Sequence, residues 1–377
     1  MDYSRRRFLQ TAAVGSASVL GTGFARGVAS HTVNQDVPQD GKGRKMLILG
    51  GTRFLGPHLV HAALASGWEI TLFNRGKSAP TMFSKLETLI GDRKDNLTAL
   101  EGRKWDVVMD TSGYVPAHVK ASAELLAEHV GHYVFISSVS VYDDKDGSPL
   151  SEDSPVGVLA DETTEEVTGA TYGPLKALCE QAAEAAMPGR VTVVRPGLIV
   201  GPLDNSGRFT YWPYRVAQGG EVLAPGNPQA ALEFIDVRDL SAFTLKCIHE
   251  AIFGIFNANG AGIGVSMQEL LHGCKMVLGV DARFTWIADK FLLDPEVGVG
   301  PWIEMPLWIP AELPNGSTVI AKALAAGLTH RPPGDTIRDT YEWSLTALEN
   351  PRTLGNSLKP QKEASVLEMW HKRPITE

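Results

Sequence analysis

The stretch Lys45-Met46-Leu47-Ile48-Leu49-Gly50-Gly51-Thr52-Arg53-Phe54-Leu55-Gly56 decides the fold of this chain. Its first five residues form a short apolar run, as in a strand that is buried on both faces of a sheet. Two glycines follow at once, and residues 57–66 then carry apolar side chains with helical spacing. The pattern predicts a strand, a tight turn and a helix.

Similar apolar runs recur along the chain, with helical patterns between some of them. The runs cover residues 69–73, 105–109, 133–136 and 191–194, and the helical patterns cover 121–130 and 176–186. This alternation is typical of a parallel sheet with helices on both faces. We therefore predict an α/β fold with a doubly wound parallel sheet of the Rossmann type.

The N-terminus has the pattern of an export signal. Ser4-Arg5-Arg6-Arg7-Phe8-Leu9-Gln10 precedes a weakly apolar stretch rich in Ala, Gly and Ser, residues 11–23. A membrane anchor needs roughly 20 strongly apolar residues, which this stretch does not have. We predict a twin-arginine signal peptide over residues 1–29 and a linker over 30–44. The expected partner is the twin-arginine export machinery, and the expected location is the periplasm or otherwise outside the cytoplasm, without a stable membrane anchor.

Charge and cysteine content exclude two classes of site. The formal net charge is −8, and residues 1–29 carry four arginines but one aspartate, so their removal makes the chain more acidic. An acidic chain without a basic stripe binds nucleic acid poorly, so we expect no nucleic acid among its partners. Cys179, Cys247 and Cys274 lie too far apart for a zinc or redox pair, and we predict no metal site.

The glycine-rich turn indicates a dinucleotide site. A tight turn between a buried strand and a helix brings backbone N–H groups close to a pyrophosphate at the helix N-terminus. Gly50 serves the turn, and Gly56 allows the helix to pack on the strand. The residues of the turn expected to contact the cofactor are Gly50, Gly51, Thr52, Arg53, Phe54, Leu55 and Gly56, and Tyr172 and Lys176 are expected to contact it from a later helix.

The end of the second predicted strand bears on the choice of cofactor. Asn74 and Arg75 stand where an acidic residue would hold the ribose hydroxyls of NAD. Asn74 can still bond a ribose hydroxyl, whereas Arg53 and Arg75 suit a 2′-phosphate because guanidinium groups bind phosphate with two parallel hydrogen bonds. The sequence therefore admits NAD or NADP and favours NADP.

A serine, a tyrosine and a lysine form the predicted catalytic group. Ser138 follows the apolar run that ends at Ile136, and Tyr172 and Lys176 lie four apart in Thr171-Tyr172-Gly173-Pro174-Leu175-Lys176. Residues four apart share a helix face, so the Lys176 ammonium is expected to lower the phenol pKa from its usual value near 10. Tyr172 would then act as acid and base, and Ser138 would bond the substrate oxygen. The alternative is a chance spacing, with the tyrosine packed and the lysine in solvent.

These motifs resemble those of the NAD-dependent epimerase/dehydratase family, the extended short-chain dehydrogenases, over about residues 45–345. Further matches are Val193-Val194-Arg195-Pro196-Gly197, Gly201-Pro202 and Phe234-Ile235-Asp236-Val237-Arg238-Asp239-Leu240. The resemblance implies an NAD(P)-dependent oxidoreductase or epimerase and a homodimer formed by the helices that flank Tyr172. It also implies that Asp92 bonds adenine, although a loop-capping role explains an aspartate there equally well.

The chain departs from the family pattern at Arg53, which stands where the second of three spaced glycines is usual. The turn also resembles an atypical branch related to chloroplast stem-loop RNA-binding proteins. This likeness leaves an alternative function, a catalytically drifted NAD(P)-binding or RNA-interacting protein. The retained Ser138, Tyr172 and Lys176 favour the enzyme.

The domain organisation follows from these motifs. We predict an NAD(P)-binding domain over residues 45–202, a smaller substrate lobe mainly over 203–345 with some segments returning to the sheet, and a C-terminal tail over 346–377. The lobe is expected to close over the carboxyl edge of the sheet. Candidate substrate contacts are Tyr114, Arg208, Tyr211, Trp212 and Arg215, although core packing is the alternative for each aromatic residue.

Export constrains the reaction. A folded protein that leaves the cytoplasm must take its nucleotide along, so we expect the cofactor to be tightly bound. The reaction is then redox-neutral, as in epimerases and dehydratases, or a second substrate reoxidises the bound cofactor. We expect a small-molecule substrate with a hydroxyl or keto group, such as a free sugar, a glycoside or another small alcohol or ketone.

Overall fold

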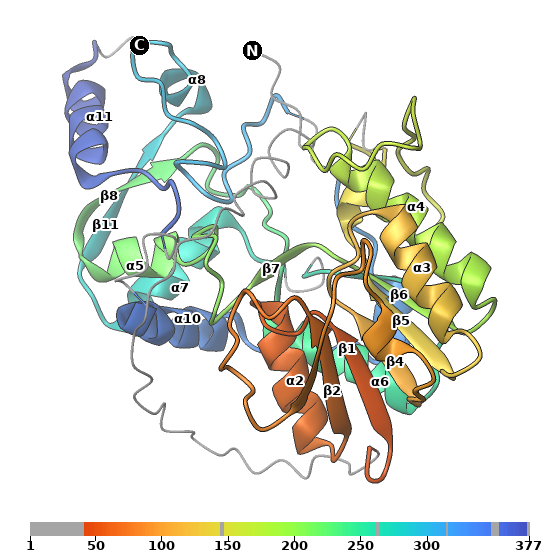
Figure 1. Cartoon of the computed structure of the whole chain (residues 1–377). Coiled ribbons are helices and arrows are strands. Elements are labelled where there is room, and N and C mark those ends of the chain that lie inside the picture. Colours follow the sequence, from red (N-terminus) through yellow and green to blue (C-terminus); the bar gives the residue numbers. More distant parts are fainter. Residues whose placement is uncertain (1–40, 144–146, 261–263, 314–315, 348–353, 375–377) are drawn as a thin grey trace.

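The computed structural model describes residues 41–143, 147–260, 264–313, 316–347 and 354–374. The predicted signal peptide, 1–29, and most of the predicted linker lie outside these residues. The described chain folds as a large parallel sheet with helices on both faces and a smaller lobe beside it (Figure 1). The predicted Rossmann-type fold is confirmed.

One seven-stranded sheet forms the core of the larger part, and each of its neighbouring strand pairs is parallel. The chain order along the sheet reverses between β1 and β4, and at such a switch point ligands bind beyond the carboxyl ends of the strands. Leu49 marks that point, since it lies opposite Phe73 of β2 and Asp110 of β4. In spatial order the strands are β10 (Gly254–Ala258), β6 (Val191–Pro196), β5 (His132–Ile136), β4 (Val107–Asp110), β1 (Lys45–Leu49), β2 (Glu69–Asn74) and β3 (Glu87–Ile90).

Helices cover both faces of this sheet. Helices α2 (Leu55–Ala65) and α6 (Val237–His249) pack on one face, and α3 (Pro116–Leu126) and α4 (Tyr172–Ala186) pack on the other (Figure 1). Successive side chains of a strand point to opposite faces. Met46 and Ile48 of β1 accordingly join the core under α2 and α6, whereas Leu47 and Leu49 join the core under α3 and α4. Burial on both faces explains why β1 is apolar without alternation.

The smaller part has its own hydrophobic core. Strand β10 and helix α9 (Ala321–Ala325), which come from the region predicted as lobe, pack with the large sheet. The short helices η1 (Thr98–Leu100) and η2 (Val139–Val141) also belong to the larger part. The lobe contains β7 (Leu198–Val200) paired with β9 (Phe234–Asp236), β8 (Gly220–Pro225) paired with β11 (Ala282–Ile287), and helices α5 (Tyr211–Ala217), α7 (Met267–Leu278), α8 (Asp289–Leu292), α10 (Pro333–Ala347) and α11 (Pro360–Lys372).

The prediction of a C-terminal tail over residues 346–377 is corrected, because this segment contains helix α11. This helix buries Val366 and Leu367 in the lobe core. Glu363, which is also buried, accepts hydrogen bonds from the Arg215 Nε at 2.6 Å and from the Leu223 backbone N–H at 3.0 Å. Glu363 lies one turn before Val366 and Leu367, so these buried side chains fix one face of α11 to the lobe, and this part of the segment is an element of the lobe.

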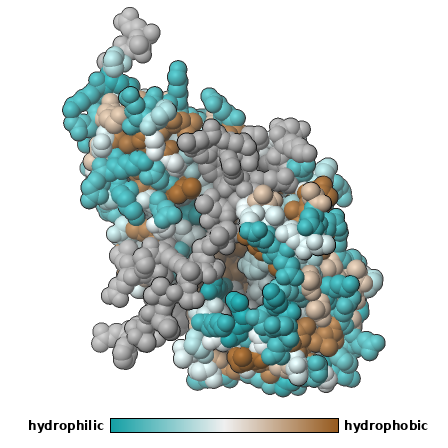
Figure 2. All heavy atoms as spheres, turned by 45° about the horizontal axis from the view of Figure 1, so that its top comes forward, coloured by the Kyte–Doolittle hydropathy of each residue, from teal (hydrophilic) through white to brown (hydrophobic). Residues whose placement is uncertain are grey.

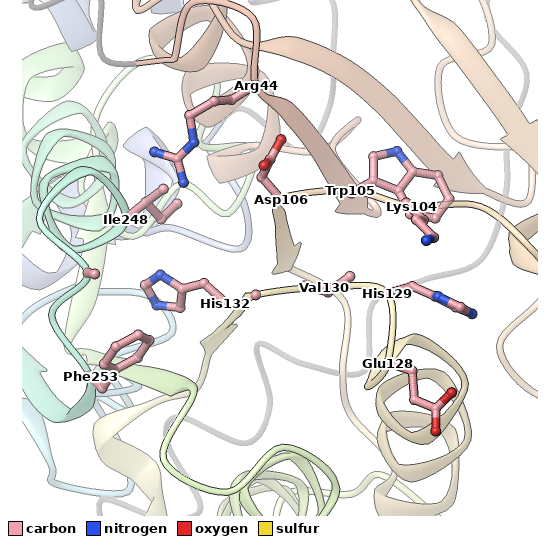
Figure 3. A pocket seen from close by; sticks show the side chains of 12 residues that line it. Arg44, Lys104, Trp105, Asp106, Glu128, His129, Val130, His132, Ile248 and Phe253 are labelled. Carbon is pink, nitrogen blue, oxygen red and sulfur yellow. The ribbon is translucent and has the colours of Figure 1, made fainter.

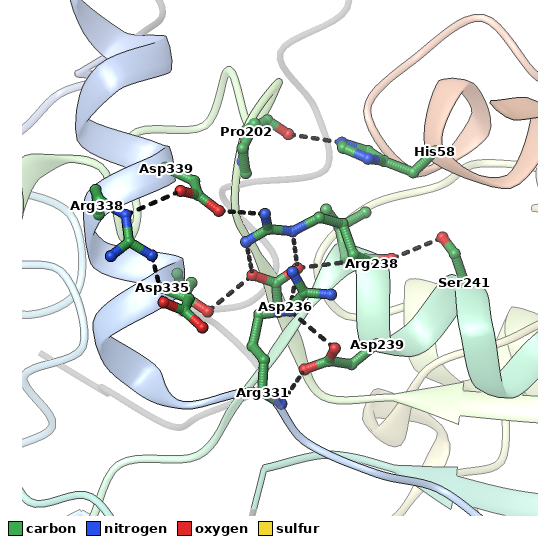
Figure 4. A network of polar contacts seen from close by, with 12 residues as sticks. His58, Pro202, Asp236, Arg238, Asp239, Ser241, Arg331, Asp335, Arg338 and Asp339 are labelled. Carbon is green, nitrogen blue, oxygen red and sulfur yellow. Dashed lines mark hydrogen bonds and ion pairs between the residues drawn. The ribbon is translucent and has the colours of Figure 1, made fainter. Parts of the chain in front are cut away.

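A cluster of ion pairs joins the lobe helix α10 to α6 on the sheet (Figure 4). Asp236, at the N-terminus of α6, pairs with Arg238 at 2.7 Å, and Arg238 also pairs with Asp339 of α10. Arg331, just before α10, pairs with Asp239 at 2.8 Å. Burial opposes the ionisation of Asp236, but the neighbouring Arg238 and Arg331 outweigh it and lower the pKa of this carboxyl. The cluster thereby ties the lobe to the helix layer of the sheet.

A hollow of about 510 Å³ lies at the amino edge of the sheet, where β1, β4 and β5 begin (Figure 3). This edge is opposite to the one at which parallel α/β sheets bind ligands, so the hollow is separate from the predicted site. The residues that line it are Arg44, Lys104, Trp105, Asp106, Glu128, His129, Val130, Gly131, His132, Ile248, Ala251 and Phe253.

His132 in this hollow makes stability depend on pH. Its Nε2 lies 2.7 Å from the Thr192 hydroxyl, and burial lowers the pKa of the imidazole to about 4 from 6.5. Because the unfolded chain takes up the proton first, this contribution to stability is complete above about pH 6.5 and is lost as the pH falls towards 4. This lowering of the His132 pKa corresponds to a contribution of about 3 kcal/mol to the free energy of unfolding.

We expect His132→Gln to lose less stability than the wild type between about pH 7 and about pH 4.5, as measured by urea unfolding at both values. His61→Gln, which changes an exposed histidine on α2, is the matched control and should follow the wild type. An equal loss in His132→Gln and the wild type would contradict the prediction.

Candidate active site

The turn between β1 and α2 has the geometry of a dinucleotide cradle. Gly50 and Gly51 adopt φ values of 103° and 85°, which side chains other than glycine rarely allow. A Cβ on Gly50 would lie 2.6 Å from the Thr111 hydroxyl, and one on Gly56 would lie 2.5 Å from the Gly51 carbonyl carbon. The backbone is therefore bare where a pyrophosphate would approach the N-terminus of α2. These residues fit the predicted cofactor.

The four residues between Gly51 and Gly56 differ in how far their side chains are exposed to solvent. Arg53 is exposed, Thr52 and Phe54 are half-buried, and the Leu55 side chain is buried in the core beneath α2. Leu55 can therefore offer a cofactor its backbone and not its side chain. Phe54 has a φ of 37°, an unusual value for a residue with a side chain, at the point where α2 begins. Of these four side chains, Arg53 is the one most open to a ligand.

Polar side chains at the ends of β2 and β3 surround the turn. The Asn74 Nδ2 lies 3.5 Å from the Gly50 carbonyl oxygen, and its Oδ1 accepts the Gly76 N–H at 2.8 Å. Arg53 donates from Nε to the Ser78 hydroxyl at 3.1 Å. The structure thus brings Asn74 and Arg53 to the same turn, next to the end of β2.

Arg75 and Asp92 lie beside each other at this edge. The Arg75 guanidinium is 4.0 Å from the Asp92 carboxylate, and both side chains are exposed to solvent. The other Asp92 oxygen accepts the Lys94 N–H at 3.2 Å, which is the loop-capping contact that the sequence allowed. An adenine contact by Asp92 stays a prediction.

Ser138 and Tyr172 meet where β5 ends and α4 begins. Ser138 precedes η2, and its hydroxyl accepts the Ser140 N–H at 3.1 Å. Tyr172 is the first residue of α4. The next residue is Gly173, and a Cβ there would overlap the Ser140 carbonyl oxygen. The glycine lets α4, which begins at Tyr172, start directly against η2, which follows Ser138.

The pKa of the Tyr172 phenol is raised, whereas the sequence predicted that it would be lowered. Burial and the neighbouring Tyr114 raise the pKa of the Tyr172 phenol, whereas the Ser138 hydrogen bond and the Arg208 charge lower it by less. The predicted lowering of this pKa by Lys176 is therefore wrong. Lys176 instead donates from Nζ to the Gly113 and Ile136 carbonyl oxygens, each at 2.7 Å.

Lys176 is itself an unusual group because its side chain is buried. Burial lowers the pKa of its ammonium to about 8. The Nζ atom lies 4.0 Å from the Phe135 ring centroid and 5.4 Å from that of Tyr114. The predicted alternative, with the lysine in solvent, is wrong. A lysine in this environment can lose or gain a proton near neutral pH.

Tyr114, the first predicted substrate contact, lies beside the catalytic group. Its ring centroid is 6.3 Å from that of Tyr172, and 46% of the residue is exposed. The Arg208 Nε donates to the Ser206 hydroxyl at 2.9 Å. Of the five predicted substrate contacts, Tyr114 packs beside Tyr172.

The other three, Tyr211, Trp212 and Arg215, are corrected by the structure. Tyr211 and Trp212 are buried in the lobe core, where the Trp212 indole N–H donates to the Pro306 carbonyl at 2.7 Å. Arg215 binds Glu363 of α11. These side chains hold the lobe together and have no free surface for a substrate, so the core-packing alternative describes both aromatic residues.

Sequence reasoning missed a buried ionic cluster beneath the site. Asp110, which is fully buried at the end of β4, pairs with Arg93 at 2.7 Å and accepts the Tyr133 hydroxyl at 2.9 Å. Arg93 also donates to Ser122 of α3 at 2.7 Å. The Asp110 carboxylate accepts the Ser112 N–H at 3.0 Å and so braces the loop that leads to Gly113. A charged residue at the end of an apolar strand was the available signal.

A second buried cluster lies behind Ser138. Glu180, one turn after Lys176 on α4, pairs with Arg195 at 2.6 Å and accepts the hydroxyl of Ser137. Arg195 also donates to the Tyr142 hydroxyl at 2.8 Å. The cluster links α4 to β6 and to the segment that carries Ser138, and thereby fixes the two halves of the catalytic group relative to each other.

Two further features of the described residues bear on the class of protein. Within the described ranges, no helix is long and apolar enough to cross a membrane, and the face in Figure 2 is mostly hydrophilic. Those same residues contain no cluster of three or more His, Cys, Asp or Glu side chains that would suit a metal ion. The three cysteines are buried and free.

Known proteins share this fold. The UDP-glucuronic acid 4-epimerase of Bacillus cereus in complex with NAD is 15% identical, with a TM-score of 0.57, covering 80% of this chain and 99% of that one. The UDP-glucose 4-epimerase of Bifidobacterium longum in complex with NAD⁺ and UDP is 19% identical, with a TM-score of 0.57, covering 82% and 99%. Structural similarity at this level of sequence identity shows a shared fold.

Sequence comparison gives the family. Over 261 residues, the chain is 28% identical to the chloroplast stem-loop binding protein of 41 kDa b of Arabidopsis thaliana. The match covers 63% of this chain and 64% of the length of that relative. Residues 46–258, more than half of the chain, match the NAD dependent epimerase/dehydratase family. The chain therefore belongs to the NAD-dependent epimerase/dehydratase family.

Proposed function

We propose that this protein is an NAD(P)-dependent oxidoreductase or epimerase that acts on a hydroxyl or keto group of a small substrate. One observation carries the proposal: Lys176 of α4, one turn after Tyr172, donates to the Ile136 carbonyl at the carboxyl end of β5, the strand end that Ser138 follows. Family membership and the nucleotide-sugar epimerases of the same fold support it.

Each residue of the group has a part in the proposed reaction. Tyr172 exchanges a proton with the substrate oxygen, and Ser138 donates a hydrogen bond to the same oxygen. A bound nicotinamide dinucleotide supplies the hydride acceptor and donor. The Lys176 ammonium is held by the Gly113 and Ile136 carbonyls and lies on the same side of α4 as Tyr172.

We further propose export through the twin-arginine machinery, on the evidence of Ser4-Arg5-Arg6-Arg7-Phe8-Leu9. An exported enzyme has little free nucleotide around it, so a tightly held cofactor and a redox-neutral or two-substrate cycle fit that location. Free sugars, glycosides or other small alcohols and ketones are then better candidates than the nucleotide sugars of the fold relatives.

Of the two dinucleotides, we propose NADP. Arg53 is held beside the turn by Ser78, and Arg75 follows β2 and lies 4.0 Å from Asp92, so both guanidinium groups are candidates to bind a 2′-phosphate. The fold relatives described above were solved with NAD, so this preference would be a property of this chain. Asn74 would hold a ribose hydroxyl.

The proposal is tested by binding. Protein stripped of nucleotide and titrated by fluorescence should bind NADPH about 10- to 100-fold more tightly than NADH, because charged hydrogen bonds to phosphate contribute about 1.5–3 kcal/mol. Arg53→Ala should reduce this preference, whereas Lys104→Ala, an exposed cation at the opposite edge, should not. Equal affinities would overturn the NADP preference, and binding of neither would overturn the cofactor itself.

A second candidate is a catalytically drifted, RNA-interacting protein, which the name of the Arabidopsis relative favours. The net charge of −8 and the retained catalytic group speak against it. Its test is a gel-shift assay with a stem-loop RNA at low and high salt, in which a salt-sensitive shift would support RNA binding.

A further inference from the structure

We propose that the hollow at the amino edge of the sheet binds a small organic anion, a carboxylate with an apolar or aromatic body. Arg44 would bind the carboxylate, and the apolar side chains beside it would cover the body. The hollow lies at the opposite edge of the sheet from the glycine turn, so this second site does not depend on the proposed function. Its volume of about 510 Å³ is usual for a small-molecule site.

The Arg44 guanidinium is held in place while its N–H groups stay open. Its central carbon lies 4.5 Å from the centroid of the Trp68 ring, and the Trp68 indole N–H donates to the His249 Nε2 at 3.0 Å. The Arg44 side chain is half-buried and makes no hydrogen bond or ion pair in the part of the chain that the structure describes. A stacked guanidinium with open donors suits a carboxylate, because two of its N–H groups match the two oxygens.

The side of the hollow next to Arg44 is largely apolar (Figure 3). Phe253 is 40% exposed, and its ring packs against the His132 imidazole with 4.6 Å between the ring centroids. Ile248 lines the same side. His132 adds no charge there at neutral pH, because burial and the Arg44 charge lower its pKa to about 4. An exposed phenylalanine beside an open guanidinium suits a ligand with an apolar body and an anionic group.

The acidic side chains of the hollow oppose an anion but do not neutralise Arg44. Asp106 and Glu128 line the hollow and balance the formal charges of Arg44 and Lys104. Lys104 and Glu128 lie on the other side from Arg44 in Figure 3. One Asp106 oxygen accepts the Lys45 N–H at 2.7 Å, and Asp106 makes no ion pair with Arg44 among the described residues. Removing the Asp106 charge should therefore strengthen anion binding.

Titration followed by fluorine NMR of the ligand tests the inference, with four probes at neutral pH and constant ionic strength. 4-Fluorobenzoate has both the anion and the ring, 4-fluorobenzamide lacks the charge, trifluoroacetate lacks the ring, and 4-fluorobenzamidine carries the opposite charge. We expect the wild type to bind 4-fluorobenzoate at least about 10-fold more tightly than each of the others. Arg44→Met should remove the preference for 4-fluorobenzoate over 4-fluorobenzamide, and Arg44→Lys should keep part of it.

Two further variants separate Arg44 from the general charge of the protein. Asp106→Asn should bind 4-fluorobenzoate about threefold more tightly than the wild type, because a nearby negative charge is removed. Arg283→Met, which removes an exposed arginine from β11, should bind it as the wild type does. Saturation with NADP⁺ should leave the affinity for 4-fluorobenzoate unchanged, since the cofactor turn is at the opposite edge.

Several results would overturn the inference. They are no binding of 4-fluorobenzoate up to about 10 mM, equal affinity for 4-fluorobenzamide, tighter binding of 4-fluorobenzamidine, or an undiminished preference in Arg44→Met. Displacement of 4-fluorobenzoate by NADP⁺ would place the anion in the cofactor site and would overturn the inference as well. Binding that depends on Arg44 in a protein that binds neither NADPH nor NADH would refute the proposed cofactor and leave the second site standing.

Discussion

Replacing Arg93 by methionine should lower the free energy of unfolding by about 3–5 kcal/mol, because it leaves a buried carboxylate without its partner. Asp110 is fully buried, and Arg93 is the cation that compensates it, at 2.7 Å. The Tyr133 hydroxyl and the Ser112 N–H would remain, but neither carries a charge. The change should also loosen the loop that presents the Gly113 carbonyl to Lys176.

Urea unfolding of the wild type and variants at neutral pH measures this effect. Arg103→Met is the matched control, since Arg103 makes an equally short pair with Glu87 but both groups are exposed; its loss should be at most about 1 kcal/mol. The double variant Arg93→Met/Asp110→Asn removes the charge and should be more stable than Arg93→Met alone. A loss below about 1 kcal/mol in Arg93→Met would contradict the account of this cluster.

The parts of the fold that the sequence predicted depend on local rules. Buried parallel strands are apolar throughout, and the turn after β1 needs glycine at Gly50 and Gly51 because their φ values are positive. The order of the motifs then places Ser138 and Tyr172 at the same edge. These features follow from short stretches of chain, so they could be found without knowledge of the tertiary contacts.

The lobe contacts could not be predicted in the same way. Trp212 is apolar enough for a core and polar enough for a ligand site, and only the packing of α5 against the rest of the lobe decides between them. The prediction of Arg215 as a substrate contact is wrong because the residue binds Glu363, which lies 148 residues away in the chain. Pairings over such distances leave no local pattern.

The electrostatics of the catalytic group show a similar limit. The spacing of Tyr172 and Lys176 correctly placed both on α4, but it could not reveal that two backbone carbonyls hold the ammonium. Nor could it reveal the burial that raises the pKa of the Tyr172 phenol. Both effects come from β5 and from the loop after β4, which reach the site only through the fold.

Loss of the Tyr172 hydroxyl should reduce turnover by about 10²- to 10⁴-fold, the usual contribution of general acid–base catalysis. Phenylalanine keeps the ring against Tyr114 and removes only the group that exchanges the proton. The affinity for NADPH should therefore stay within about threefold of the wild-type value. Tyr341→Phe, which removes a phenol from α10 in the lobe, should turn over at the wild-type rate.

The measurement that tests the central claim most directly is turnover by the wild type and Tyr172→Phe, each saturated with NADP⁺ and given sugars, sugar acids and sugar phosphates. Absorbance at 340 nm follows net oxidation, and proton NMR follows a change of configuration without net oxidation. We predict conversion of at least one of these compounds by the wild type and its near-complete loss in Tyr172→Phe with NADPH binding intact. Conversion at the same rate by both proteins would contradict the account.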